Sequence, residues 1–245
     1  MQNAHIRHMF NLLRYALILS LFIFSWKPAT VCAQQIINME EHDAKPYYFG
    51  ITLAANQSNF RLYQAPVFLQ EDSIMVVEPL KTMGFNLGLL ANARLSRYFD
   101  LRFNPQLVFA SKNLYYRENY PKPETDTEKK IESILLSFPL QIKFKSDRIG
   151  NMRVYTIAGL KYDYDLAANA RARRDDNLVK VKTTDYGYEI GAGFEFYFQS
   201  FIFSPEFKIS NGIGNVHLKD EHLRYSNVIE KLHSRMIVFS IHLEG

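Results

Sequence analysis

The chain has 245 residues and a formal net charge of +4, with 47% hydrophobic residues, 22% charged residues and one cysteine. A single cysteine excludes a disulfide framework within the chain. Residues 1–33 contain three basic residues and no acidic one, so the remaining chain carries 26 basic and 25 acidic residues, and this near balance argues against a nucleic-acid partner.

The N-terminus has the order of a secretory signal peptide. Arg7 and Arg14 precede an apolar run from Tyr15 to Trp26, and small residues follow near Ala33. The run is too short to cross a bilayer as a helix. An uncleaved anchor and a lipid-modified Cys32 are the alternatives. We therefore expect a signal peptide at 1–33, an N-terminal polar segment at 34–45 and a barrel at 46–245.

After the polar segment, eight stretches alternate between apolar and mostly polar residues. In one of them the apolar positions are Phe99, Leu101, Phe103, Leu107 and Phe109. Successive side chains of a strand point to opposite faces, so each stretch predicts a strand with one apolar face, about long enough to cross a bilayer at a tilt. In chain order the predicted strands are 46–56, 83–96, 99–112, 132–145, 152–165, 184–198, 201–210 and 235–244.

The connections between these strands alternate in length. Those at 97–98, 146–151 and 199–200 are short, whereas those at 57–82, 113–131, 166–183 and 211–234 are long. Outer-membrane barrels have an even strand number, short periplasmic turns and long outer loops. The prediction is an all-β fold, an eight-stranded antiparallel transmembrane β-barrel in the outer membrane of a Gram-negative bacterium. The first long connection is rich in apolar residues, which favours a small hairpin or an apolar surface offered to another protein.

The opposite face of the strands carries charged residues of both signs. Eight strands leave an interior that side chains fill, so these residues predict a paired charge network in the lumen and not a conducting pore. A soluble lipocalin-type barrel, whose apolar face would point inward around a ligand, is the alternative orientation. The predicted lumen residues are Arg94, Arg102, Lys143, Lys161, Asp163, Glu189, Glu195, Glu206 and Lys208.

The sequence contains no convincing catalytic constellation. His217 and His222 flank two acidic residues in the last long connection, but their spacing matches no helix-borne metal motif and indicates a solvated loop. We therefore predict no enzyme activity, no cofactor, no metal site and no small-molecule substrate.

Several segments resemble the PorT family of small outer-membrane barrels. They include LRFNPQLVF (101–109), YGYEIGAGFEFYF (186–198) and FSPEFKISNGIGNV (203–216), with KSDR (145–148) at a short turn. The resemblance implies an accessory role in the type IX secretion system, which exports proteins with C-terminal sorting domains and in some bacteria supports gliding motility. Candidate partner contacts are Lys145, Ser146, Asp147, Arg148 and Asn151 at the turn and Phe68 in the first long connection.

The leading hypothesis is thus a non-enzymatic outer-membrane barrel that assists type IX secretion through protein contacts. Its expected partners are outer-membrane lipid and other secretion-system proteins. The alternatives are a stand-alone surface or adhesin-like barrel and the soluble lipocalin-type barrel.

Overall fold

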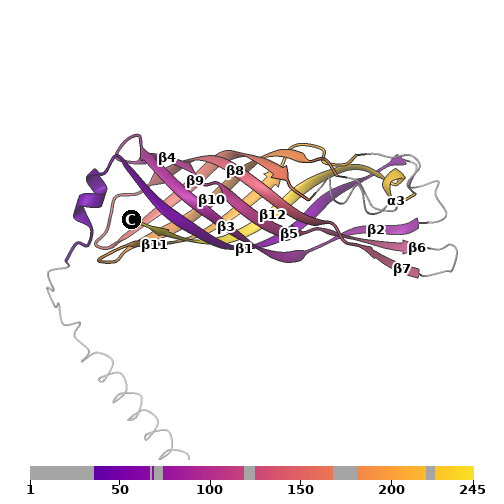
Figure 1. Cartoon of the computed structure of the whole chain (residues 1–245), viewed down its shortest axis with the longest axis horizontal. Helices are drawn as coiled ribbons and strands as arrows, with labels where there is room; N and C mark the ends of the chain where they lie inside the picture. Colours follow the sequence, from indigo (N-terminus) through magenta and orange to yellow (C-terminus); the bar gives the residue numbers. More distant parts are fainter. Residues whose placement is uncertain (1–35, 67, 69–73, 119–124, 168–180, 219–223) are drawn as a thin grey trace, which may run out of the picture. The chain divides into compact units, whose positions relative to one another are not determined.

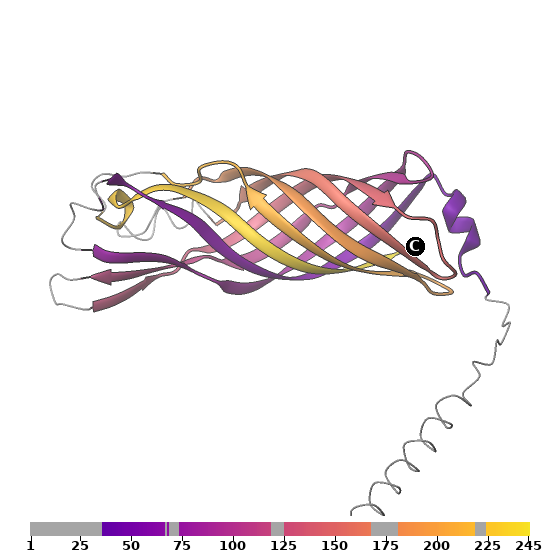
Figure 2. The ribbon, with the colours of Figure 1, turned by 180° about the vertical axis from the view of Figure 1, so that it is seen from behind.

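The computed structural model describes residues 36–66, 68, 74–118, 125–167, 181–218 and 224–245, and the expected signal peptide lies outside these ranges. The described chain forms a closed antiparallel barrel (Figures 1 and 2). β1 pairs with β12 on one side and with β3 on the other, which closes the ring. The predicted eight-stranded barrel is confirmed. Its wall consists of β1 (Tyr47–Gln64), β3 (Thr82–Arg94), β4 (Phe99–Phe103) continued by β5 (Gln106–Ser111), β8 (Glu132–Lys145), β9 (Met152–Asp165), β10 (Thr184–Tyr197), β11 (Ile202–Gly212) and β12 (Ile229–Glu244).

The third wall position is split, although the sequence predicts one strand at 99–112. β4 ends and β5 begins on either side of Asn104 and Pro105. Proline has no N–H to donate to a ladder, and β8 carries a second proline, Pro139, at the position that faces Asn104. The Asn104 N–H donates to the Pro139 carbonyl (3.3 Å), and the Leu89 N–H donates to the Pro105 carbonyl (3.0 Å). The two prolines therefore interrupt the ladder without changing its register.

The two faces of the barrel differ in polarity. Leu89 and Leu160 point outward and are 65% and 68% exposed, whereas Arg102 and Lys143 point inward and are completely buried. An apolar outer band with a polar interior is the arrangement of a membrane barrel. A lipocalin-type barrel requires the opposite arrangement.

The short turns and the N-terminal segment share one end of the barrel, where a short 3-10 helix, η1 (Glu40–Ala44), precedes β1 (Figure 1). Because short turns face the periplasm in such barrels, this is the periplasmic end. No helix within the described residues is long and apolar enough to span a membrane.

At the outer end, strands extend beyond the band where the sequence predicts loops at 57–82 and 113–131. β1 and β12 stay paired as far as Gln64 and Ile229. A separate three-stranded sheet contains β2 (Ile74–Leu80), β6 (Asn113–Glu118) and β7 (Thr125–Lys129), and α3 (Arg224–Asn227) lies nearby (Figure 1). The expected hairpin in the first connection is wrong, because β2 pairs with β6.

Candidate functional site

The centre of the barrel holds an ion network around Arg102 on β4. Its guanidinium lies 2.5 Å from Glu206 on β11 and 3.9 Å from Glu244 on β12, and all three side chains are completely buried. The Tyr155 hydroxyl donates to Glu206 (3.0 Å), and its ring lies 5.1 Å from the guanidinium. His242 Nε2 lies 3.5 Å from Glu206. Four strands thus contribute to one buried cluster.

A second part of the network lies toward the periplasmic end. The Lys143 ammonium pairs with Glu195 and lies 3.8 Å from Glu244. Lys145 pairs with Asp100 at 2.7 Å, and the Tyr48 hydroxyl donates to the same carboxylate at 2.8 Å. Each buried cation here has a carboxylate neighbour, as burial of a charge requires.

Two further pairs fill the outer half of the interior. Lys161 lies 2.5 Å from Asp163, and Lys208 lies 3.1 Å from Glu189. A β-carbon at position 187 would lie 2.3 Å from the Asn211 carbonyl oxygen on β11 and 2.8 Å from Lys161 Cε, so glycine at 187 permits the close approach of β11 beside that lysine. A lumen cavity at this level measures about 10 Å³, about the space that one water molecule needs.

The structure places eight of the nine predicted lumen residues inside the barrel. The ninth, Arg94, lies at the periplasmic mouth, where its guanidinium donates to the carbonyls of His42 (3.1 Å) and Asp43. Alternate residues of a strand share a face, so counting in steps of two from a predicted lumen residue identifies further residues that point into the lumen. The members that the prediction missed are Tyr48, Asp100, Lys145, Tyr155, His242 and Glu244.

The periplasmic mouth is covered by the segment around η1, which we call the cap (residues 37–45). Asp43 of the cap lies 3.4 Å from Arg148 and 2.9 Å from Arg153. The His42 ring is buried, with its centroid 4.6 Å from that of Tyr48 in an edge-to-face contact. This burial lowers the pKa of His42 from 6.5 to about 4, despite nearby carboxylates. His42 is therefore a neutral aromatic wedge in the mouth at neutral pH.

Most of the predicted partner-contact residues have partners within the chain. Lys145 points into the barrel and pairs with Asp100. Arg148 contacts the cap, and its guanidinium donates to Asn151 Oδ1 at 2.8 Å. Ser146 and Asp147 remain at the surface of the turn, where Asp147 pairs with Arg97 at 2.8 Å. At the other end, Phe68 packs against an apolar cluster.

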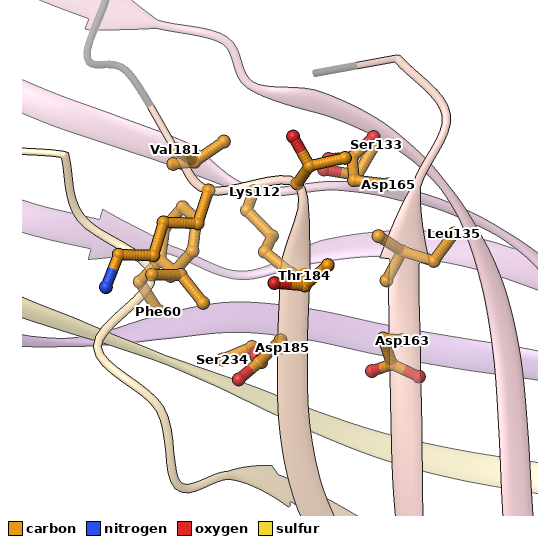
Figure 3. Close-up of a pocket in the computed structure, with 13 residues that line it drawn as sticks. Phe60, Lys112, Ser133, Leu135, Asp163, Asp165, Val181, Thr184, Asp185 and Ser234 are labelled. Carbon is orange, nitrogen blue, oxygen red and sulfur yellow. The ribbon is translucent and has the colours of Figure 1, made fainter. Parts of the chain in front are cut away.

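That apolar cluster covers the outer mouth. It joins β1 and β12 to the three-stranded sheet, and its buried members are Phe60, Ile74, Val77, Leu114, Tyr116, Ile131, Val216, Val228, Ile229 and Leu232. Below it, a cavity of about 30 Å³ is lined by Phe60, Lys112, Asp163, Asp185 and Ser234 among others (Figure 3). This volume suits one or two water molecules.

The arrangement supports no evident chemistry. Within the described ranges, no three or more His, Cys, Asp or Glu side chains are grouped so as to hold a metal ion. His217 Nε2 lies 2.9 Å from the Ser226 hydroxyl, and His222 lies outside those ranges. The buried ions neutralise one another, and the cap and the apolar cluster cover the two mouths.

A family model described as "Outer membrane protein beta-barrel domain" matches residues 33–218. The chain belongs to this family. It is an outer-membrane barrel of a Gram-negative bacterium, and nothing in the description of the matched family points to catalysis. The description of the family names neither PorT proteins nor type IX secretion.

The chain is similar to solved outer-membrane barrels at low sequence identity. Neisserial surface protein A (NspA) is 14% identical with a TM-score of 0.42, covering 81% of this chain and 96% of NspA. OprG from Pseudomonas aeruginosa is 13% identical with a TM-score of 0.44, covering 81% of this chain and 93% of OprG. Ail of Yersinia pestis, solved with the heparin analogue sucrose octasulfate, is 12% identical with a TM-score of 0.36, covering 82% of this chain and all of Ail. No curated protein sequence matches the chain.

Proposed function

We propose that this protein is a non-conducting outer-membrane barrel that acts through protein contacts as an accessory component of type IX secretion. The observation that carries the non-conducting part is the filled interior. Arg102, Glu206 and Lys143 are completely buried side chains in the middle of the lumen, and the cap and the apolar cluster cover its mouths. A solute has no path through such a barrel, so its activity resides on its exposed surfaces.

The secretion role is supported by the resemblance of the strand segments to the PorT family. The turn at 146–151 is the surface we assign to a periplasmic partner. Its Asp147 carboxylate and the neighbouring Arg97 guanidinium are 59% and 74% exposed. Exposed pairs of this kind contribute little to stability, so they are free to exchange partners.

A stand-alone surface role is the second candidate, and the outer sheet favours it. β2, β6 and β7 raise an ordered structure above the membrane band, where a short loop would suffice to connect the strands. An adhesin-like protein would use this structure to contact molecules outside the cell.

Two experiments test the proposal. In planar bilayers, the purified protein should produce no stable conductance steps, and steady channel activity would contradict a filled lumen. In a deletion strain, export of cargo with a C-terminal sorting domain should fall, and wild-type protein should restore it. Unchanged export in the deletion strain would refute the secretion role and leave the surface role.

Matched charge reversals locate the contact. Asp147→Arg alters the periplasmic turn, and Glu230→Arg alters a similarly exposed carboxylate at the outer end (59% and 50% exposed). We expect Asp147→Arg to reduce export and Glu230→Arg to leave it unchanged. The reverse result would place the contact outside the cell.

A further inference from the structure

The outward face of β1 and β12 changes from apolar to basic as the strands leave the membrane band. Within the band, Leu53 lies opposite Ile241 and Ala55 opposite Phe239. Beyond it, the register pairs Asn59 with Arg235, Arg61 with His233, and Tyr63 with Lys231. Residues two apart on a strand share a face and lie about 7 Å apart. The basic side chains therefore begin within one or two such steps of the lipid acyl chains, at the depth of the headgroups.

A groove of about 420 Å³ lies against these side chains, and we call it the basic groove. Arg61, His233 and Arg235 line it, together with Tyr63 and Tyr188. The Arg61 guanidinium lies 5.4 Å from the Tyr63 ring centroid, and the Tyr63 and His233 rings meet edge to face at 5.6 Å. The groove is thus built on paired strands with ordered aromatic contacts, and not on a free loop.

The cations of the groove lack carboxylate partners of their own. Among the described residues, Arg61 and Arg235 form no ion pair, and both are exposed. The neighbouring Lys231 has a half-exposed partner, Glu230, at 3.7 Å. In the β1–β12 register Arg61 lies opposite His233 and Arg235 lies opposite Asn59, so the two arginines are diagonal neighbours on one face. Diagonal neighbours are within reach of long side chains, so one anion between the two guanidinium groups would contact both.

We propose that the basic groove binds the phosphate of a phosphorylated lipid headgroup in the outer leaflet. Arginine guanidinium groups match phosphate geometry with paired hydrogen bonds, and tyrosine rings favour the membrane interface. The acyl chains of such a lipid would lie along Leu53, Phe239 and Ile241 directly below. This site is independent of the secretion role.

The test compares lipids in nanodiscs that contain the full mature protein. The probes are discs of phosphate-free digalactosyldiacylglycerol with added lipid A, or with lipid A from which the phosphates have been removed, and native mass spectrometry counts the retained lipid. We expect wild-type protein to retain phosphorylated lipid A about tenfold more than the dephosphorylated form, given the strength of charge-assisted hydrogen bonds. Equal retention of the two forms would overturn the proposal, and this arm needs no variant.

A charge-neutralising variant tests the residues. Arg61→Gln/Arg235→Gln should lose the preference, whereas Arg117→Gln/Lys130→Gln removes two exposed cations from the other side of the outer end and should keep it. Heat-modifiable gel migration verifies that both variants are folded. Retention by the groove variant equal to wild type would assign the lipid elsewhere. Inorganic phosphate is titrated separately, and binding as tight as that of lipid A would show a site for free phosphate instead.

Discussion

Removal of Arg102 should be among the most damaging single changes in the barrel. Its guanidinium has two carboxylate neighbours, Glu206 at 2.5 Å and Glu244 at 3.9 Å, and none of the three is exposed. In Arg102→Met, the partners that remain among the described residues are the Tyr155 hydroxyl and His242 for Glu206, and Lys143 and Asn92 for Glu244. Breaking a buried pair from one side leaves an uncompensated charge, which costs about 3–5 kcal/mol.

A second substitution, Glu206→Gln, separates the cost of the stranded charge from the cost of lost packing. Arg102→Met also removes the contact between the guanidinium and the Tyr155 ring, and this loss is common to the single and the double variant. In Arg102→Met/Glu206→Gln the stranded carboxylate becomes a neutral amide, so we expect about half or more of the lost stability to return. A matched exposed variant is Arg97→Met, whose partner Asp147 is 59% exposed. Its cost should be about 0–1 kcal/mol.

The assay is urea unfolding in lipid vesicles, followed by far-UV circular dichroism and by heat-modifiable gel migration. Tryptophan fluorescence is unsuitable, because the one tryptophan, Trp26, lies in the predicted signal peptide. The reasoning is refuted if Arg102→Met costs no more than Arg97→Met. It is equally refuted if the double variant is as unstable as the single one, because the loss would then come from packing.

Further predictions concern the lipid face and the cap. Leu140→Arg places a charge on a side chain that is 51% exposed to lipid, so it should cost about 2–4 kcal/mol by vesicle unfolding, whereas Ser200→Arg at an exposed position of a periplasmic turn should cost little. The cap should loosen as pH falls from 6.5 toward 4, because only the released His42 binds a proton in that window; the loss is at most about 3 kcal/mol. Cleavage after Glu41 by a glutamyl endopeptidase that is active at both pH values should then accelerate, and His42→Phe should abolish the pH dependence. Asp43→Asn should accelerate cleavage at every pH, since two arginine contacts are lost.

The membrane-spanning strands could be predicted from the sequence because lipid and lumen impose opposite demands on alternate residues. The predicted strands at 132–145 and 152–165 coincide with β8 and β9. The ion pairs could not be predicted in the same way. Arg102 and Glu206 are 104 residues apart, and their contact depends on the register of every strand between them. Lys145 is the last residue of its strand, so it is predicted to lie in the turn. It lies two residues from Lys143 and therefore shares the inward face of β8, where it pairs with Asp100.

The outer extensions went unpredicted because the polarity of the alternation reverses there. On β1, Leu53 points outward to lipid and Thr52 inward, but eight residues later Arg61 points outward and the buried Phe60 inward. The period of two continues unchanged, and only the solvent outside the wall differs. A search for apolar residues on a fixed face therefore ends the strand at the membrane boundary.

This reversal also locates the membrane boundary. The outward apolar run on β1 extends from Tyr47 to Ala55, close to the nine to eleven residues that cross a bilayer core at a tilt. Beyond it the wall has an apolar interior, the Phe60 cluster, and a basic exterior at Arg61. The lumen charges form ion pairs with one another, whereas Arg61 and Arg235 form no ion pair with any described residue and lie at the level of the headgroups. The barrel thus holds ion pairs in its interior and presents two arginines without an ion-pair partner among the described residues where anionic lipid meets β1 and β12.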